Sequence, residues 1–309
     1  MVRYIASRFL YMIVTFLIIA TLTFFLMQTL PGSPFNDEKL SEAQIELLNK
    51  RYGLDKPVAI QYVIYISNLF QGDLGVSFQF DGRPVTKIIG ERIPASAFLG
   101  GQALIFGTII GLFLGIIAAL RHNTVMDYGA MLLAVIGLSI PSFVFAGLLQ
   151  YWVGVKWKLL PVAFWEGYQY TILPTLSLSV FVIAQVARFM RTEMLEVLGQ
   201  DYIVTAKAKG INRTAIVFKH TIRNALIPVI TILGPLAVNI MTGSLVIEKI
   251  FGVPGLGEQF VLSIMTNDFP VIMGITLFYA ALFIVIIFIV DVLYGVIDPR
   301  IRLSGGKGS

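Results

Sequence analysis

Cysteine is absent from this sequence of 309 residues, and histidine occurs only at His122 and His220. Without cysteine the chain has no disulfide framework, no thiolate metal site and no thiol nucleophile. The two histidines offer little material for an imidazole metal site. We therefore expect the chain to bind no metal.

Charged residues are also scarce, at 13% of the sequence, whereas soluble domains carry about 25%. Hydrophobic residues make up 57%, and the mean hydropathy is +0.82. A chain with so few charges cannot present a polar surface to water on all sides, so the composition predicts a membrane protein. The net charge of +5 is small for a nucleic-acid-binding surface, and we expect no nucleic acid partner.

Long apolar windows give the fold class. A helix needs roughly 20 apolar residues to cross the hydrocarbon layer, and six windows free of Asp, Glu, Lys and Arg approach or exceed that length. These windows are 9–30, 98–120, 128–155, 170–187, 224–247 and 271–290. They are apolar around the whole helical circumference and do not alternate with period two, which predicts an all-α protein of six transmembrane helices.

The distribution of Lys and Arg predicts the orientation. If the N-terminus is cytoplasmic, the inner segments carry 13 Lys and Arg residues, and the short outer segments carry only three. Basic residues in short loops favour the cytoplasmic side. Both termini are therefore expected in the cytoplasm, with residues 299–309 as an inner tail.

The long segment 31–97 is then extracellular. Ser41 and Gln44 form a capping-box pattern for a first helix, which Gly53 would end, and Pro57 would begin a second. This predicts a small helical cap with mixed charge on the outer surface. The alternative is a packed loop with no role in ligand binding.

The cytoplasmic segment between the fourth and fifth windows predicts a helical elbow. Asp201 would cap a short helix that runs to Lys209, Gly210 would supply a left-handed stop, and Asn212 would cap a second helix leading to the membrane.

This elbow is suited to contact with another protein. The small side chains of Ala206 and Ala208 would let a partner's backbone approach, and Lys207 and Lys209 could meet acidic groups on the partner. The alternative is an ordinary basic loop attracted to anionic lipid.

Prolines and small polar residues mark a candidate path through the membrane. A proline inside a helix removes one backbone hydrogen bond. The apolar windows contain four such prolines: Pro141, Pro174, Pro228 and Pro235. The candidate path residues nearby are Ser139, Ser142, Asn239, Thr242 and Ser244. Asn239 is the first candidate, because a buried amide needs several partners. Alternatively, these residues only join helices.

Several motifs together resemble the permease subunits of ATP-binding-cassette importers, in the branch that carries oligopeptides, dipeptides and nickel. The resemblance rests on Leu30-Pro31-Gly32-Ser33-Pro34, Gly72-Asp73-Leu74-Gly75, Ile140-Pro141-Ser142-Phe143, Asp201 to Gly210, His220 to Pro228, Gly252-Val253-Pro254-Gly255-Leu256-Gly257 and Asp298-Pro299-Arg300. Within this branch the chain is most similar to the oligopeptide permease of the B type.

The resemblance implies a type I importer permease fold, with the transmembrane domain at 98–298 and a coupling helix at about 201–210. The coupling residues that it implies are Asp201, Tyr202, Thr205, Ala206, Lys207, Ala208, Lys209, Gly210 and Asn212. It further implies a second homologous permease, two cytoplasmic ATP-binding subunits that hold ATP and Mg, and an extracellular solute-binding protein that delivers a peptide. A dipeptide or nickel-complex permease of the same family is the alternative.

Two other classes of protein are less consistent with the sequence. An ion-coupled secondary transporter would carry acids deep in its spans, and an intramembrane protease would carry a recognisable catalytic motif; neither stands out. The Gly306-Lys307 pair lacks the other residues of a phosphate-binding loop, so we expect no cofactor and no ATP site on this chain.

Overall fold

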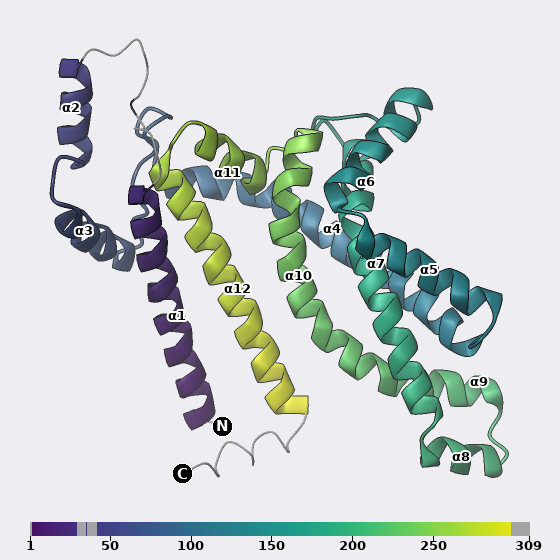
Figure 1. Ribbon diagram of the computed structural model, residues 1–309. Coiled ribbons are helices and arrows are strands. Elements are labelled where there is room, and N and C mark those ends of the chain that lie inside the picture. Colours follow the sequence, from purple (N-terminus) through teal and green to yellow (C-terminus); the bar gives the residue numbers. More distant parts are fainter. Residues whose placement is uncertain (1, 30–34, 36–41, 298–309) are drawn as a thin grey trace. The chain divides into compact units, whose positions relative to one another are not determined.

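The computed structural model describes residues 2–29, 35 and 42–297, with side chains for all of these except 2–5, 42, 241–243, 291 and 293–297. The described residues form α-helices with two π-helical segments, η1 and η2, and no named strand (Figure 1). The elements in chain order are α1 (Val2–Thr29), α2 (Glu42–Tyr52), α3 (Val58–Phe70), α4 (Val85–Leu120), α5 (Val125–Ser139), α6 (Ser142–Leu149), η1 (Gln150–Lys156), α7 (Gln169–Leu198), α8 (Asp201–Ala208), α9 (Arg213–Ala215), η2 (Ile216–Ile222), α10 (Arg223–Phe251), α11 (Leu256–Met265) and α12 (Phe269–Ile297). The all-α prediction is confirmed.

Five stretches of helix in the described part of the chain are long and apolar enough to cross a membrane, and a bent pair makes a sixth candidate. The five are Ala6–Thr29, Val85–Leu120, Gln169–Leu198, Arg213–Ile240 and Phe269–Val290. The sixth is Val125–Ser139 followed by Ser142–Lys156, with a bend of 102°.

The bend corrects the expectation of one continuous helix over 128–155. Proline restricts the preceding residue to extended backbone, and Ile140 accordingly has φ −86° and ψ 120° between α5 and α6. Pro174 in α7 and Pro228 and Pro235 in α10 lie inside continuous helices. Only Pro141 therefore interrupts a described span.

The second span also begins earlier than expected. Helix α4 starts at Val85 rather than near 98, because the charged residues that end the apolar window do not end the helix. Arg92 pairs with Glu258 at 3.2 Å, which balances one of these charges. The first turns of α4 thus belong to the segment that the sequence analysis placed outside the membrane.

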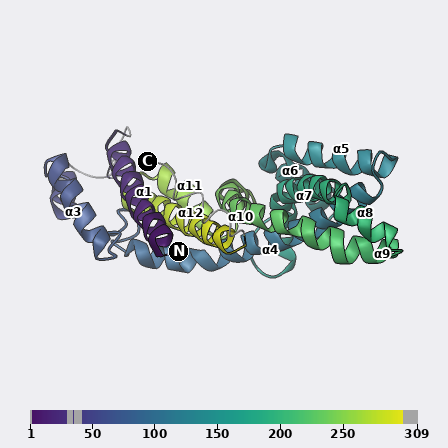
Figure 2. The same cartoon turned by 90° about the horizontal axis from the view of Figure 1, so that it is seen from below.

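The chain forms two compact units, and the first comprises residues 1–95 and 254–309. Helices α1 and α12 run side by side in it (Figures 1 and 2). Its core contains six buried side chains from α4, α11 and α12: Val85, Ile88, Ile89, Leu256, Val271 and Ile275.

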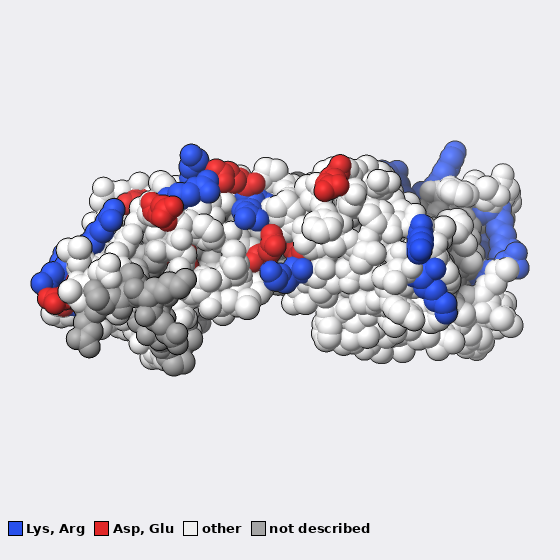
Figure 3. All heavy atoms as spheres, turned by 90° about the horizontal axis from the view of Figure 1, so that it is seen from above, with Lys and Arg blue, Asp and Glu red and all other residues white. Residues whose placement is uncertain are grey.

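The part of this unit that precedes α4 contains two helices joined at a glycine. Gly53 follows α2 with φ +70°, and Pro57 occupies the position before α3, as the sequence predicted. Ser41 lies outside the described residues, so its part in the capping box does too. Acidic and basic side chains are interspersed on the upper face of the unit (Figure 3). Lys50 and Glu46 on α2 form an exposed ion pair at 2.7 Å.

The second unit comprises residues 96–253, and α7 lies at its centre. Helix α7 packs against α5, α6 and α10, and 56% of its most apolar window is buried. Three glycines of α4 face it, and a Cβ added to Gly107, Gly111 or Gly115 would lie within 2.6–2.7 Å of an α7 atom. These glycines therefore allow the two helices to approach closely.

Candidate functional site: the elbow and the cavity at the helix break

The elbow, residues 201–215, projects from one end of the second unit, at the opposite end from α6 (Figure 1). Seen from below, α8 and α9 lie beside the end of α7 (Figure 2). The chain leaves α7 through Gly199 and Gln200, enters α8, turns at Gly210 and returns through α9 and η2 into α10. The elbow is thus attached to both α7 and α10.

Helix α8 rests on η2 through a small apolar cluster. Ile203 and Ala206 are 0% and 6% exposed, and they pack with Ile216. The other residues of α8, and Lys209 and Gly210, are exposed: Asp201, Tyr202, Val204, Thr205, Lys207 and Ala208. Of the two alanines considered for contact with a partner, therefore, only Ala208 lies on the exposed face.

Backbone conformation, without a side-chain cap, sets the start of α8. Its N-cap is Gln200, and Asp201 is the first helical residue, so the prediction of Asp201 as the cap is wrong. Extended backbone at Gln200 (ψ 148°) starts the helix one residue earlier than expected. Asp201 still lies in the first turn, where a negative charge interacts favourably with the helix dipole.

The glycine corner is as predicted. Gly210 has φ +75°, and its N–H donates to Lys207 O at 3.0 Å. A Cβ added there would meet nothing within 4 Å. The position thus requires glycine for its backbone conformation and not for lack of space.

The second arm of the elbow is capped by Asn212. Its Oδ1 accepts a hydrogen bond from Ala215 N at 2.7 Å, which confirms the predicted cap. Tyr202 on the first arm accepts a hydrogen bond from Asn224 Nδ2 at 2.9 Å, at the start of α10. The first arm is therefore connected to α10 by a polar contact and to η2 by the apolar cluster.

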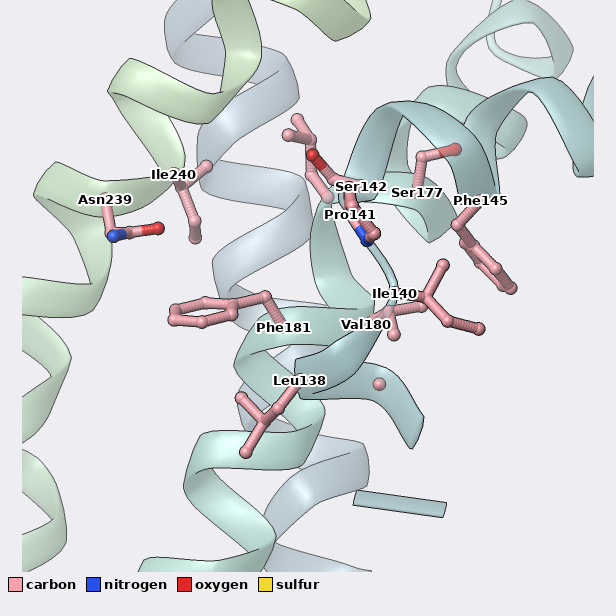
Figure 4. A pocket seen from close by; sticks show the side chains of 12 residues that line it. Leu138, Ile140, Pro141, Ser142, Phe145, Ser177, Val180, Phe181, Asn239 and Ile240 are labelled. Atoms are coloured by element: carbon pink, nitrogen blue, oxygen red, sulfur yellow. The ribbon is translucent and has the colours of Figure 1, made fainter. Parts of the chain in front are cut away.

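A cavity of about 150 Å³ lies at the break between α5 and α6. It is bounded by the break, by α7 and by α10 (Figure 4). Ser142, Ser177 and Asn239 supply polar side chains to the residues that line it, and Pro141 lies at the helix break itself. Asn239 on α10 and Phe181 on α7 extend into the space between these two helices (Figure 4). We call it the break cavity.

The structure brings together only some of the candidate path residues. Ser142 and Asn239 line the break cavity, whereas Ser139 is not among its lining residues and donates to Val135 O at 2.8 Å. Ser244 is 2% exposed and lies further along α10. The side chain of Thr242 lies outside the described residues.

Buried carboxylates were not singled out by the sequence analysis. Asp127 and Glu248 in the second unit are both 0% exposed. Arg191 pairs with Asp127, and Ser96 donates to Glu248 at 2.7 Å. In the sequence, each of these acids stands at the edge of an apolar window, which could have indicated a buried carboxylate. Their partners, Arg191 and Ser96, could not be identified because they are 64 and 152 residues away in sequence.

The first unit buries Asp268 between α11 and α12. Burial raises the pKa of its carboxyl, while hydrogen bonds from the Ser77 hydroxyl and from the backbone N–H of Phe78 lower it. The carboxylate thereby holds the turn that precedes α4 against the start of α12. No cluster of three or more His, Cys, Asp or Glu side chains that could hold a metal ion occurs in the described ranges.

The fold is that of a polytopic all-helical membrane protein, with five or six apolar spans in the described part of the chain. A crystal structure of an amino acid ABC transporter matches it with a TM-score of 0.52 and 17% identity, over 70% of this chain and 94% of that chain. This likeness supports the permease fold.

The chain belongs to the family described as the binding-protein-dependent transport system inner membrane component, whose model matches residues 111–303. The N-terminal model of the same system matches residues 1–100. The resemblance found in the motifs is thus confirmed.

The similarity to curated relatives extends over nearly the whole chain. The dipeptide transport system permease protein DppB of Bacillus subtilis (strain 168) is 48% identical over 98% of this chain and 99% of its own length. DppB of Lactococcus lactis subsp. cremoris (strain MG1363) is 46% identical, over 98% and 100%. The oligopeptide transport system permease protein OppB of Salmonella typhimurium is 41% identical, also over 98% and 100%.

Proposed function

We propose that this chain is the permease subunit of an ATP-driven importer that moves short peptides across the cell membrane. The observation that carries the proposal is its similarity to relatives named as dipeptide and oligopeptide permeases, which covers 98% of the chain. The relatives named for dipeptides are more similar than the one named for oligopeptides, at 46% and 48% against 41%. Dipeptides are therefore the first cargo to test.

The energy comes from partner subunits in this proposal. Two cytoplasmic ATP-binding subunits hold ATP and Mg, a second homologous permease completes the pathway, and an extracellular solute-binding protein delivers the peptide. The exposed elbow is the docking point for an ATP-binding subunit. Its proposed contact residues are Asp201, Tyr202, Thr205, Lys207, Ala208, Lys209, Gly210 and Asn212, with Ala206 supporting them from beneath.

The elbow has the connections that such a docking point needs. Because α8 packs on η2, which continues into α10, a displacement of α8 is passed to α10. Because α8 also follows α7 after only two residues, α7 is displaced as well. Packed helices respond to such a push by discrete shifts and not by gradual bending.

The break cavity is the proposed part of the peptide path. Ser142 and Asn239 face it from different helices, so a relative movement of these helices would change its width. Ser139, Thr242 and Ser244 are proposed to line the path in other conformations of the transporter. Both termini are proposed to be cytoplasmic, with residues 31–97 outside.

Substitution of Gly210 tests the proposal. A β-branched residue is strained by about 1–2 kcal/mol or more at positive φ, and no neighbour within 4 Å obstructs the side chain. We expect Gly210→Val to lower ATP-dependent peptide uptake in proteoliposomes that contain the complete transporter, while ATP hydrolysis continues. Gly210→Asn is the matched control, because asparagine tolerates this conformation and should keep most of the uptake.

Copurification gives an independent answer. The wild-type chain should bring an ATP-binding subunit with it from membranes of its own organism. Unchanged uptake by Gly210→Val, together with no ATP-binding subunit in the purified complex, would contradict the proposal.

A further inference from the structure

A partly buried ion pair, whose Arg191 side chain is 23% exposed and whose Asp127 side chain is 1% exposed, links α5 to α7 at the elbow end of the second unit. Asp127 lies in the first turn of α5 and is 0% exposed. Arg191 on α7 donates hydrogen bonds to both carboxylate oxygens of Asp127, from Nε to Oδ1 at 2.5 Å and from Nη2 to Oδ2 at 2.8 Å. This two-point contact fixes the orientation of the two side chains as well as their separation.

The loop between α4 and α5 closes around the same carboxylate. Asn123 N donates to Asp127 Oδ2 at 3.0 Å, and His122 Nδ1 lies 3.1 Å from that oxygen. Asn123 has φ +60°, a conformation that asparagine tolerates better than most residues. His122 Nδ1 is also 3.2 Å from Arg191 Nη2. The ion pair therefore holds the end of α4, the start of α5 and α7 together.

An ion pair with a buried carboxylate is not required for a stable helix bundle. The cost of removing both charges from water commonly cancels their attraction, so an apolar pair of similar size would stabilise the bundle as well. What the ion pair adds is a contact with one allowed geometry, which cannot slide as an apolar contact can. Such a contact suits two helices that must move together.

The rest of the α5–α7 interface agrees with this role. At the other end of α5, a Cβ added to Gly137 would lie 2.9 Å from Val180 Cγ1 of α7. Helix α5 is thus close to α7 at both of its ends. It then leads directly to Ile140 and Pro141 at the break cavity.

We infer that Asp127 and Arg191 are positioning residues that make α5 follow α7 when the elbow is displaced. This inference rests on the proposed function. The Pro141 and Ser142 wall of the break cavity then moves with α7, relative to Asn239 on α10. The width of the cavity changes because α5 and α7 move together, while α10 is displaced separately through α9 and η2.

Spin-label distances in the assembled transporter test this directly. The chain has no cysteine, so single pairs can be introduced without removing any. Leu133→Cys on α5 with Thr192→Cys on α7 reports the α5–α7 distance, and Leu133→Cys with Ile230→Cys reports the α5–α10 distance; all three positions are exposed. Distances are compared without nucleotide and after trapping with ATP and vanadate.

In the otherwise wild-type transporter we expect one narrow α5–α7 distance that is the same in both states, and an α5–α10 distance that shifts on trapping. Arg191→Lys keeps the charge but loses the two-point contact, and it should broaden the α5–α7 distribution. An α5–α7 distance that shifts as much as the α5–α10 distance would overturn the inference. If Arg191→Lys does not assemble, the two distances without this substitution decide the question.

The functional readout is the amount of a labelled alanine dipeptide taken up per ATP hydrolysed. We expect a several-fold loss of this ratio in Arg191→Lys and Asp127→Asn, with assembly and ATP hydrolysis retained. Arg83→Lys is the matched control, because Arg83 makes a similar contact with Glu91 at 2.8 Å on the exposed surface. An unchanged ratio in both Asp127→Asn and Arg191→Lys would count against the inference. Failure of the proposed function itself would appear as no ATP-dependent uptake in the wild type.

Discussion

Among the described residues, Asp127, Glu248 and Asp268 are carboxylates with 0% exposure. An isolated charge in an apolar interior is unfavourable, and such groups are normally paired, hydrogen-bonded or protonated. Asp127 is paired with arginine, whereas Glu248 and Asp268 accept hydrogen bonds from serines. The arginine-paired carboxylate and the two serine-bonded carboxylates thus meet different environments, and they should respond differently to substitution.

Asp268 should make stability depend on pH. Its pKa in the folded protein is raised by burial, so its contribution to stability is complete below the ordinary pKa of aspartate and is lost as the pH rises through the raised value. Asp268→Asn imitates the protonated carboxyl and lacks this dependence. We expect the thermal unfolding midpoint of the variant, relative to wild type, to rise from mildly acidic to neutral pH.

The control for this prediction is Glu46→Gln, which alters an exposed carboxylate paired with Lys50. Its midpoint relative to wild type should change little over the same pH interval, because an exposed ion pair contributes little. A relative midpoint of Asp268→Asn that stays constant with pH would contradict the assignment.

At the scale of elements, close packing and a proline break shape the second unit. Helix α4 approaches α7 along Gly107, Gly111 and Gly115, at successive turns of the helix. Small residues at this spacing let two backbones approach. The bend at Pro141 then directs α6 away from the line of α5. The close approach depends on the absence of a Cβ, and the bend depends on the extended backbone that Pro141 imposes on Ile140.

Gly111→Ala should destabilise the protein although alanine is the better helix former. The new Cβ would lie 2.7 Å from Val186 Cβ and 2.9 Å from Ile183 O, and the latter is a backbone atom. Overpacking of this kind costs about 1–3 kcal/mol. The measurement is the midpoint of thermal unfolding in detergent, which should fall.

Gly101→Ala on the same helix is the matched control, because nothing lies within 4 Å of its added Cβ. There the gain in helix propensity, about 0.5–1 kcal/mol, should leave the midpoint unchanged or raised. Equal midpoints for the two variants would show that α4 and α7 are not in close contact at Gly111.

At the scale of the whole molecule, the positive residues predict how the chain crosses the membrane. The inner segments of the proposed topology carry 13 Lys and Arg residues against three in the short outer segments. The apolar spans and the family both agree with a multi-pass membrane protein. The orientation follows from the basic residues alone.

Labelling of introduced cysteines checks the orientation. Lys158→Cys lies in a segment that the proposed topology places outside and Lys209→Cys lies on the elbow, and both positions are exposed. A membrane-impermeant maleimide added to intact cells should label Lys158→Cys and leave Lys209→Cys unlabelled until the membrane is opened. The opposite pattern would reverse the topology, and the absence of native cysteine removes any background from this chain.

The elbow shows how far local sequence can be interpreted. Gly210 and Asn212 adopt the conformation and the cap that their residue types predict, because both depend on a few neighbouring residues. Asp201 does not cap α8, because the neighbouring Gln200 takes the extended conformation first. Ala206, which is small and near the exposed corner in sequence, is buried against Ile216.

The sequence by itself determined that this is an all-helical membrane protein of the importer permease family, with a glycine-cornered elbow. These properties follow from composition, from apolar windows and from short motifs, which act over a few turns of chain. Only the tertiary structure decided that Arg191 neutralises Asp127, 64 residues away, and that Ser142 and Asn239 share a cavity. Such contacts depend on how distant helices pack, and hydrophobic burial, which drives that packing, is non-directional and does not specify partners in the sequence.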